Sequence, residues 1–206
     1  MRINQDVGLE SATLPPVDVL VSDLLFPTVV WRKELSYDTS SLKDYINNLR
    51  DNDNGRVLSN HGGWQSLGVP TGLPNEFKEL EHIFNDTANQ VCAEANLPSI
   101  RLDNLWYNVN IPGSYNSIHN HQGSILSGVY YIDVPEENMG DIEFFRSDDS
   151  QYYLRNNDQT AFGSERCVYK AQTGVLLIFP SWLRHAVQSN MSTQNRISMS
   201  FNYVWS

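Results

Sequence analysis

The sequence has few charged residues, few cysteines and no long hydrophobic run, and each shortage excludes a class of protein. Only 18% of its 206 residues are charged, below the roughly 25% of an average soluble domain. Its 14 Lys and Arg are outnumbered by 24 Asp and Glu, which gives a net charge of −10. Clustered basic residues supply affinity for phosphate backbones, so we do not expect nucleic acid as a partner. No apolar run approaches the ~18 residues that a membrane-spanning helix needs, so we expect no membrane contact.

The two cysteines, Cys92 and Cys167, lie far apart in the chain. Residues 1–20 lack the charged-then-apolar order of a secretion signal,. Together these features predict free, buried thiols in a reducing compartment, and hence a soluble cytoplasmic protein.

Aromatic residues are plentiful by contrast, at 11% of the chain, with 10 Tyr and 5 Trp. This balance of many aromatic and few charged residues excludes disorder for the bulk of the chain. The length suits one domain, residues 1–206, with a sizeable core. A homodimer stays open.

The N-terminal half combines one predicted strand with two predicted helices. A strand is expected at 27–35, because β-branched and aromatic residues dominate there. Helix N-cap candidates lie at 38–41, before a helix that runs through Leu49, and an apolar stripe at helical spacing predicts a second helix over 75–96. We expect a loose arm at 1–17 and a Gly- and Pro-rich loop at 56–76.

After Pro98 the chain consists of short predicted strands separated by turn signals. These strands cover residues 101–111, 117–121, 125–133, 140–146, 160–170, 174–179, 184–189 and 196–205. This spacing indicates a sandwich or barrel, and a strand number of about eight is typical of a jelly roll. We therefore predict an α+β, mainly β protein, in which residues 18–100 support a β core at 101–206.

Three of the five histidines lie in the β-rich half: His119, His121 and His185. On a strand, side chains at i and i+2 point to one face, so His119 and His121 could reach one metal ion. Distant strands of a sandwich face each other, which could bring His185 to the same ion. A lone His-x-His pair often arises by chance. Here, however, Gly113 precedes it by six residues and Arg196 follows His185 by eleven, which makes the pattern specific.

These motifs resemble the double-stranded β-helix oxygenases that use Fe(II) and 2-oxoglutarate. Those enzymes carry H-x-D or H-x-E, then a distal His, then an Arg that is often part of R-x-S. The resemblance is closer still to a branch of 2-oxoglutarate/iron oxygenases without an assigned substrate. It rests on HNH (119–121), SGVYYI (127–132), LIFPSWLRH (177–185), RISMSFN (196–202), LFPTVVW (25–31) and GWQS (63–66). The resemblance implies a cupin-like double-stranded β-helix with Fe(II) as cofactor and 2-oxoglutarate as cosubstrate.

One residue departs from the family pattern, because His121 stands where a carboxylate is usual. The 2-His-1-carboxylate face is the standard iron(II) oxygenase site, although imidazole also suits zinc, copper and nickel. Our hypothesis is that His119, His121 and His185 bind the metal. In the alternative, Asp141 or Glu143 supplies a carboxylate and one of the paired histidines is not a ligand.

A dicarboxylate cosubstrate needs a cationic anchor, and Arg196 suits this role because a guanidinium donates two parallel hydrogen bonds and stays charged when buried. Ser198 and Asn202 share its strand face, and Ser198 adds a hydroxyl. The resemblance implies Tyr131 as a further anchor. Asn110 is a weaker candidate, for a hydrogen bond to the carboxylate that is bound to the metal. Alternatively, the face with Arg196 and Ser198 could simply be the solvent face of the strand.

The resemblance implies hydroxylation of a C–H bond with release of succinate and CO2. The substrate itself, a small molecule or a peptide, cannot be read from the sequence. Long loops over a scaffold carry specificity, so Trp64 and Gln65 in one loop, and the loop 147–166, are the expected walls of the entrance.

Two other functions stay open. Cupin metal dioxygenases or isomerases that do not use 2-oxoglutarate share the spacing of glycine and histidine, but they normally place a Glu shortly after His-x-His, where this chain has QGSIL (122–126). A plain cupin also has no need of Arg196 and Ser198. The third function is a non-catalytic β-sandwich binding module whose histidines are incidental.

Overall fold

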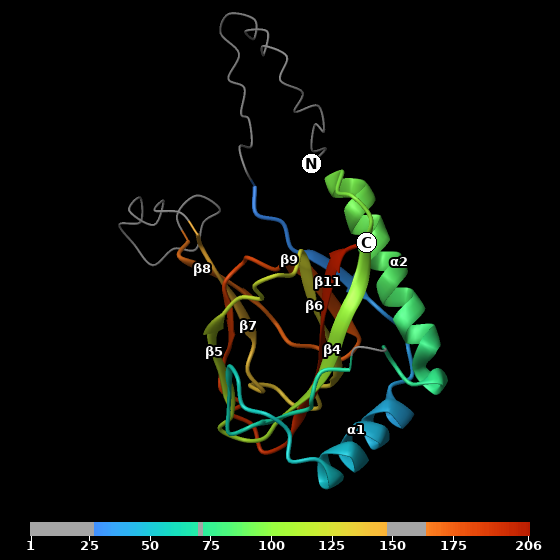
Figure 1. Ribbon diagram of the computed structural model, residues 1–206. Coiled ribbons are helices and arrows are strands. Elements are labelled where there is room, and N and C mark those ends of the chain that lie inside the picture. The colour runs from blue at the N-terminus through green and yellow to red at the C-terminus, as the bar shows by residue number, and fades with distance from the viewer. Residues whose placement is uncertain (1–26, 70–71, 148–163) are drawn as a thin grey trace, which may run out of the picture.

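The computed structural model describes residues 27–69, 72–147 and 164–206 (Figure 1). The expected arm at 1–17 and most of the expected entrance loop 147–166 lie outside the described residues. The elements are β1 (Trp31–Glu34), α1 (Ser40–Asn52), β2 (Asn60–His61), β3 (Trp64–Gln65), the 3-10 helix η1 (Asn75–Phe77), α2 (Lys78–Ala95), β4 (Ile100–Asn110), β5 (Tyr115–His119), β6 (Leu126–Asp133), β7 (Ile142–Phe145), β8 (Arg166–Tyr169), β9 (Val175–Pro180), β10 (His185–Val187) and β11 (Arg196–Trp205).

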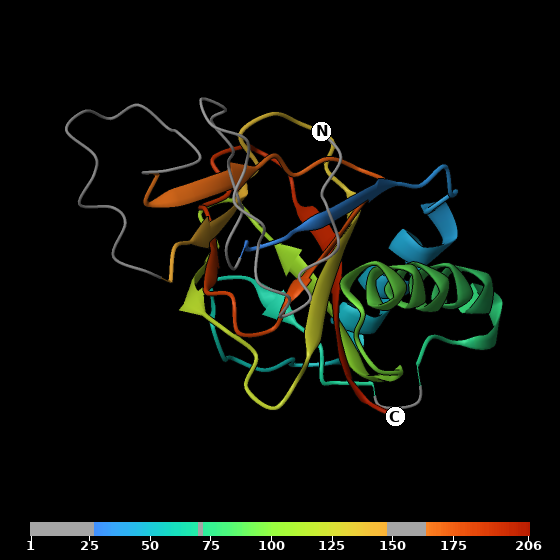
Figure 2. The ribbon, with the colours of Figure 1, turned by 90° about the horizontal axis from the view of Figure 1, so that it is seen from above.

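The strands form two antiparallel sheets that face each other. The larger sheet has six strands in the order β1-β9-β6-β11-β4-β3, and the smaller has five in the order β2-β5-β10-β7-β8. The central strand β11 pairs with β4 on one side and β6 on the other. Both helices lie on the outer side of the larger sheet, and the smaller sheet lies across from its inner side (Figure 2). The sandwich that the turn spacing predicted is therefore present.

Alternation along β11 decides which side chains the helices cover. Its apolar residues Ile197, Met199, Phe201 and Tyr203 are all buried in the core that includes α1 and α2. Phe84 of α2 stacks on Phe201, with 5.0 Å between the ring centroids. The opposite face of β11 is thereby turned towards the interior of the sandwich.

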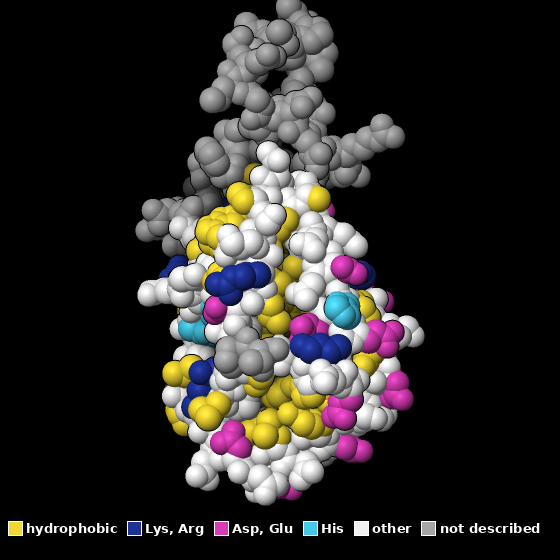
Figure 3. Space-filling model, turned by 45° about the vertical axis from the view of Figure 1, so that its right-hand side comes forward, with side chains coloured by type: hydrophobic (Ala, Val, Ile, Leu, Met, Phe, Trp, Pro, Cys, Tyr) yellow, Lys and Arg dark blue, Asp and Glu magenta, His cyan; other side chains and the backbone are white. Residues whose placement is uncertain are grey.

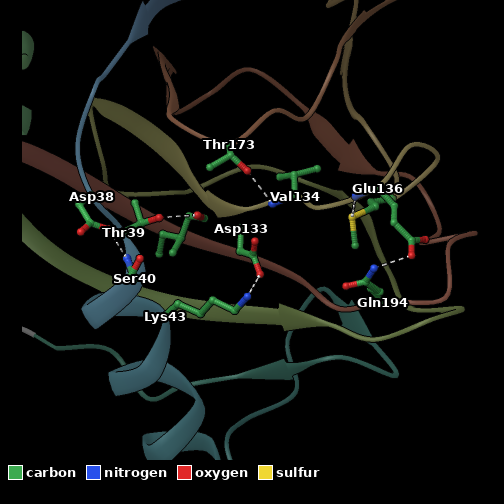
Figure 4. Close-up of polar contacts among 11 residues, drawn as sticks. Asp38, Thr39, Ser40, Lys43, Asp133, Val134, Glu136, Thr173 and Gln194 are labelled. Atoms are coloured by element: carbon green, nitrogen blue, oxygen red, sulfur yellow. Dashed lines mark hydrogen bonds and ion pairs between the residues drawn. The ribbon is translucent and has the colours of Figure 1, made fainter.

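Polar contacts tie the start of α1 to the end of β6 (Figure 4). The Thr39 hydroxyl donates to the Ile132 carbonyl at 2.9 Å. The Lys43 Nζ lies 2.6 Å from a carboxylate oxygen of Asp133. These contacts fix the helix against the sheet at the point where β6 leaves it.

Most elements agree with the sequence-based predictions. The helix expected over 75–96 is present as η1 and α2, and strand β1 is shorter than the expected 27–35. The loop expected at 56–76 contains the short strands β2 and β3. The strand expected over 117–121 ends at His119, so His119 and His121 do not share a strand face. The backbone N–H of His121 instead donates to the Ser181 carbonyl at 3.0 Å, where the chain turns.

Both cysteines are free, and Cys92 is buried whereas Cys167 is exposed. The prediction of two buried thiols is therefore wrong for Cys167, which lies on β8 at the edge of the smaller sheet. Within the described residues, no helix is both long and apolar enough to cross a membrane. The assignment of the chain to one domain, with residues 18–100 supporting 101–206, stays a prediction.

Candidate active site

A cavity of about 380 Å³ opens between the two sheets,. The inward face of β11 lines it with Arg196, Ser198, Ser200 and Asn202. In register with these four residues, β4 contributes Asn110, Asn108, Trp106 and Asn104. Arg196 is 2% exposed and Ser198 5%. The alternative in which this face of β11 is the solvent face is therefore wrong.

The structure brings His119, His121 and His185 together on the wall of this cavity. One ring nitrogen of each lies within 4.8 Å of the others. His119 ends β5 and His185 begins β10, and the two are direct partners in the antiparallel pair. His121 reaches them from the turn after β5, with its ring centroid 5.1 Å from that of His185. The pairing of β5 with β10, rather than the i, i+2 spacing, thus builds the cluster.

Each of the three imidazoles has its Nδ1 engaged with an oxygen acceptor. His119 donates to the Ser117 carbonyl at 2.7 Å and His185 to the Leu183 carbonyl at 2.9 Å. Since a carbonyl oxygen only accepts, Nδ1 must carry the proton in both rings. The lone pair then lies on Nε2, which is the nitrogen left to bind a metal.

The acceptor for His121 is a side chain. Its Nδ1 lies 2.6 Å from the Oδ1 of Asn202, and the Ser127 hydroxyl donates to the same Oδ1 at 2.8 Å. The Asn202 amide nitrogen donates to the Oδ1 of Asn104 at 3.2 Å, which orients the amide. The sequence-based analysis placed Asn202 on the face of Arg196 but gave it no role, and it missed Ser127.

Burial lowers the pKa of all three histidines. The effect is largest for His185, whose pKa falls to about 3. The rings are therefore neutral near pH 7, which is the form that binds metal. Three neutral imidazoles fit iron, zinc, copper or nickel by their donor type.

Neither carboxylate of the alternative ligand set joins this cluster. Asp141 accepts a hydrogen bond from the backbone N–H of Ala171 at 2.9 Å. Glu143 accepts from Arg166 at 2.8 Å and from Gln188 at 2.7 Å. Strand alternation explains this, because the next residue, Phe144, is the one that faces the cluster and approaches the ring of His185,.

Arg196 is a buried guanidinium with unused donors. Its Nη1 donates to the Met139 carbonyl at 3.1 Å and also to the Gly140 carbonyl. Its Nε is buried and has no hydrogen-bond partner. Within the described residues no carboxylate forms an ion pair with it. Burial lowers the pKa of Arg196, and nearby Tyr131 and Asp141 oppose that shift.

The other predicted cosubstrate residues lie beside Arg196. Ser198 pairs with Tyr131 of β6 in the sheet register, and Asn110 pairs with Arg196 itself. All of them line the cavity. Burial raises the pKa of Tyr131 to about 12, so its hydroxyl stays protonated and can donate.

Of the two expected entrance residues, Gln65 lines the cavity and Trp64 does not. The Trp64 indole donates to the Asp53 carbonyl at 2.9 Å, which turns it towards the loop after α1. The sequence-based analysis also missed Arg56, which lines the cavity beside Gln65.

Comparison with known proteins relates the β-rich half of the chain to a family. Residues 104–202 match the model of the family described as "Putative 2OG-Fe(II) oxygenase". Over this segment, just under half of its length, the chain is similar to the 2OG-Fe(II) oxygenases. The matched segment contains the three clustered histidines and Arg196. A search of the curated proteins finds no match.

Solved oxygenase structures share the fold at low sequence identity. The prolyl-4-hydroxylase of Pseudomonas putida superposes with a TM-score of 0.64 at 12% identity, covering 87% of this chain and 94% of its own. HygX of Streptomyces hygroscopicus, solved with nickel, 2-oxoglutarate and hygromycin B bound, gives 0.60 at 12%, covering 87% and 84%. A Trichoplax adhaerens prolyl hydroxylase, solved with a hypoxia inducible factor peptide, gives 0.61 at 13%, covering 85% and 83%.

These matches confirm the double-stranded β-helix that the sequence predicted. The family match and the solved neighbours together support a 2OG-Fe(II) oxygenase, and the expected use of iron and 2-oxoglutarate agrees with them.

Proposed function

We propose that this protein hydroxylates a C–H bond of an organic substrate, with His119, His121 and His185 as the iron ligands. In the overall reaction, substrate, O2 and 2-oxoglutarate give hydroxylated substrate, succinate and CO2, so that one oxygen atom enters each organic product. One observation carries the proposal. Three neutral imidazoles converge in a cavity that also holds a buried guanidinium, with which no carboxylate of the described residues forms an ion pair.

The chain would hold iron through the three Nε2 atoms. Bound Fe(II) supplies the activation of dioxygen that oxidises 2-oxoglutarate and the substrate. The protein's own contribution is to fix each ring, through Ser117, Leu183 and Asn202, with its lone pair towards the metal,.

The distal carboxylate of 2-oxoglutarate would lie against Arg196. The guanidinium of Arg196, which lines the cavity, would give charge-assisted hydrogen bonds, and the hydroxyls of Ser198 and Tyr131 would add further donors,. Tyr131 can serve because its pKa of about 12 keeps the proton on its oxygen. Asn110, the sheet partner of Arg196, is positioned to donate from its amide.

Ser198 and Ser200 lie between Arg196 and Asn202 on the same face of β11, and Asn202 contacts His121. A 2-oxoglutarate molecule anchored at Arg196 would thus extend along these hydroxyls towards the histidines. Its charge would compensate a metal that three neutral rings leave cationic.

For the substrate we propose a small molecule or a peptide. Hygromycin B occupies HygX, and a peptide of hypoxia inducible factor occupies the Trichoplax enzyme. A homodimer and a cytoplasmic location stay predictions from the sequence.

The test is succinate formation from 2-oxoglutarate in air, measured with and without added Fe(II). We expect iron-dependent succinate from the parent protein and none from His185→Ala. His61→Ala is the control, because His61 is exposed and stacks on Tyr115 outside the cluster. Iron uptake without succinate formation would favour a cupin-type enzyme instead. A lack of metal uptake would leave the binding module as the function.

A further inference from the structure

The described lining of the cavity contains no acidic side chain. Two arginines, Arg56 and Arg196, are its only charged residues, beside several Asn and Gln amides. The chain as a whole carries a net charge of −10, and Asp and Glu side chains are visible on the helix-bearing side of the molecule (Figure 3). The described lining is thus cationic in a chain of net negative charge, and it favours anions,.

Arg56 is held in place but lacks an acidic partner. With the Gln65 amide turned so that its Oε1 faces the guanidinium, this oxygen accepts from Nε at 3.1 Å and from Nη2 at 3.3 Å. The Cζ of Arg56 lies 5.8 Å from the centroid of the Trp106 ring. In the described part of the chain, no carboxylate pairs with Arg56 and no acceptor contacts its Nη1. One edge of a preorganised guanidinium is therefore free for a ligand.

The position of Arg56 separates it from Arg196. Trp106, which Arg56 covers, lies 5.5 Å from the ring of His121, centroid to centroid. Leu58, two residues after Arg56, also lines the cavity and is 66% exposed, which places this part of the lining at the opening. Arg196 pairs instead with Asn110, four residues beyond Trp106 on β4. The two cations are thus available to two different anionic groups.

We infer that Arg56 binds an anionic group, a carboxylate or a phosphate, of the small molecule that the enzyme oxidises. The inference rests on the proposed function, in which Arg196 is occupied by 2-oxoglutarate. It narrows the substrate to carboxylic acids or phosphate esters. In such a substrate, the carbon to be oxidised must lie near the three histidines while the anionic group lies at Arg56. The free Nη1 edge and the nearby amides supply the donors,.

The first test measures anion binding without turnover. The full chain is loaded with Zn²⁺ and saturated with 2-oxoglutarate, and its guanidinium N–H signals are followed by NMR while inorganic phosphate or acetate is added. The Arg56 signal is identified by its loss in Arg56→Gln, and exposed Arg101 is the control. We expect a saturable shift at Arg56 and none at Arg101. No saturable shift with either anion, or equal shifts at both arginines, would overturn the inference.

The two anions distinguish the two classes of substrate. A shift with acetate alone points to a carboxylic acid, and a shift with phosphate alone points to a phosphate ester. The affinity for the effective anion, measured by calorimetry, is expected to fall at least about tenfold in Arg56→Gln, because a hydrogen bond between charged groups is lost. The anion affinity of Arg56→Lys should lie between those of the parent protein and Arg56→Gln. The anion affinity of Arg101→Gln should equal that of the parent protein. An unchanged affinity in Arg56→Gln would contradict the inference.

The second test uses turnover. Acids and phosphate esters are screened for stimulation of succinate release, each beside its uncharged amide or alcohol. We expect the charged member of a pair to stimulate and the uncharged member to do so at least about tenfold less, by the same reasoning. An uncharged compound that stimulates the parent protein and Arg56→Gln equally would refute the assignment. A protein that releases no succinate under any condition contradicts the proposed function instead, whereas the NMR result at Arg56 stands apart from it.

Discussion

The hydrogen bond between His121 and Asn202 distinguishes this ring from the other two in the cluster. His119 and His185 donate to main-chain carbonyls, which substitution cannot remove. The Nδ1 of His121 instead lies near two side-chain oxygens, the amide oxygen of Asn202 at 2.6 Å and the Ser127 hydroxyl at 3.0 Å. A partner outside the ligand set orients a metal-binding His and raises its basicity. If His121 binds the metal as proposed, we therefore expect Asn202 to position it.

Replacement of Asn202 should therefore weaken metal binding. Asn202→Leu removes the nearer acceptor of the His121 Nδ1 proton and leaves only the Ser127 hydroxyl, 3.0 Å from this nitrogen. We expect the metal affinity to fall about 10–100-fold. Asn202→Asp retains an acceptor oxygen and should keep most of the affinity. A metal titration followed by calorimetry measures both. Equal affinities in the parent protein and Asn202→Leu would show that Asn202 does not position His121.

Removal of the His121 ring should lower the metal affinity more than removal of its hydrogen-bond partner does. His121→Ala takes away one of three nitrogens, so we expect a larger loss of Fe(II) affinity than in Asn202→Leu. His61→Ala removes an exposed histidine outside the cluster and is expected to bind iron like the parent protein. If His121→Ala retained full affinity while Glu143→Ala lost it, the carboxylate alternative would replace the three-histidine site.

At the scale of elements, the turn between β6 and β7 holds Arg196 in place. The carbonyls of Met139 and Gly140 accept from its guanidinium. Glu136, at the start of this turn, accepts from the amide of Gln194 at 2.6 Å, which joins the turn to the approach to β11 (Figure 4). The position of Arg196 in the cavity thus depends on backbone carbonyls of a turn that lies outside the cavity.

Gly140 is the vulnerable point of this turn. Its φ is +85°, and a Cβ built there would overlap the Gln188 carbonyl oxygen. We expect Gly140→Ala to displace the carbonyl that Arg196 uses, and so to weaken 2-oxoglutarate binding while metal affinity stays unchanged. Gly113→Ala is a matched control, because Gly113 has a φ of +84° but open space at its Cβ position. Equal 2-oxoglutarate affinities in the two variants, measured by calorimetry, would contradict this role of the turn.

The sequence predicted well whatever depends on local alternation. The β11 pattern placed Arg196, Ser198 and Asn202 on one face, and the cavity lies on that face. The sequence could not predict the contacts that depend on which strands pair with each other. His121 lies in a turn rather than on β5, and Glu143 faces Arg166 rather than the histidines. Both outcomes are set by contacts with residues far away in the chain.

At the scale of the whole molecule, the two faces of the larger sheet lie in different environments. The outer face packs on α1 and α2, and the inner face lines the cavity. Phe84 of α2 is 2% exposed and contacts both Phe201 and Tyr130. Along the same strands, alternate residues therefore pack in the outer core or line the cavity.

Truncation of the outer core should cost stability without altering the site. We expect Phe84→Ala to lower the free energy of unfolding by about 3–5 kcal/mol, because it leaves a cavity under α2. The folded variant should still bind one metal ion per chain. Leu67→Ala, at a residue that is 61% exposed, should have little effect,. Urea denaturation gives the stabilities, and a loss of metal binding by the folded Phe84→Ala protein would show that the two faces are coupled.

The central claim is that one cavity binds iron through three histidines and 2-oxoglutarate through Arg196. Its most direct test is an anaerobic titration of 2-oxoglutarate into the Fe(II)-loaded protein, followed by the weak visible charge-transfer band that a 2-oxo acid gives when it coordinates iron. We predict a saturable band in the parent protein, a much higher half-saturating concentration in Arg196→Leu, and no band in His185→Ala. Tight iron binding with no spectral response to 2-oxoglutarate would contradict the account.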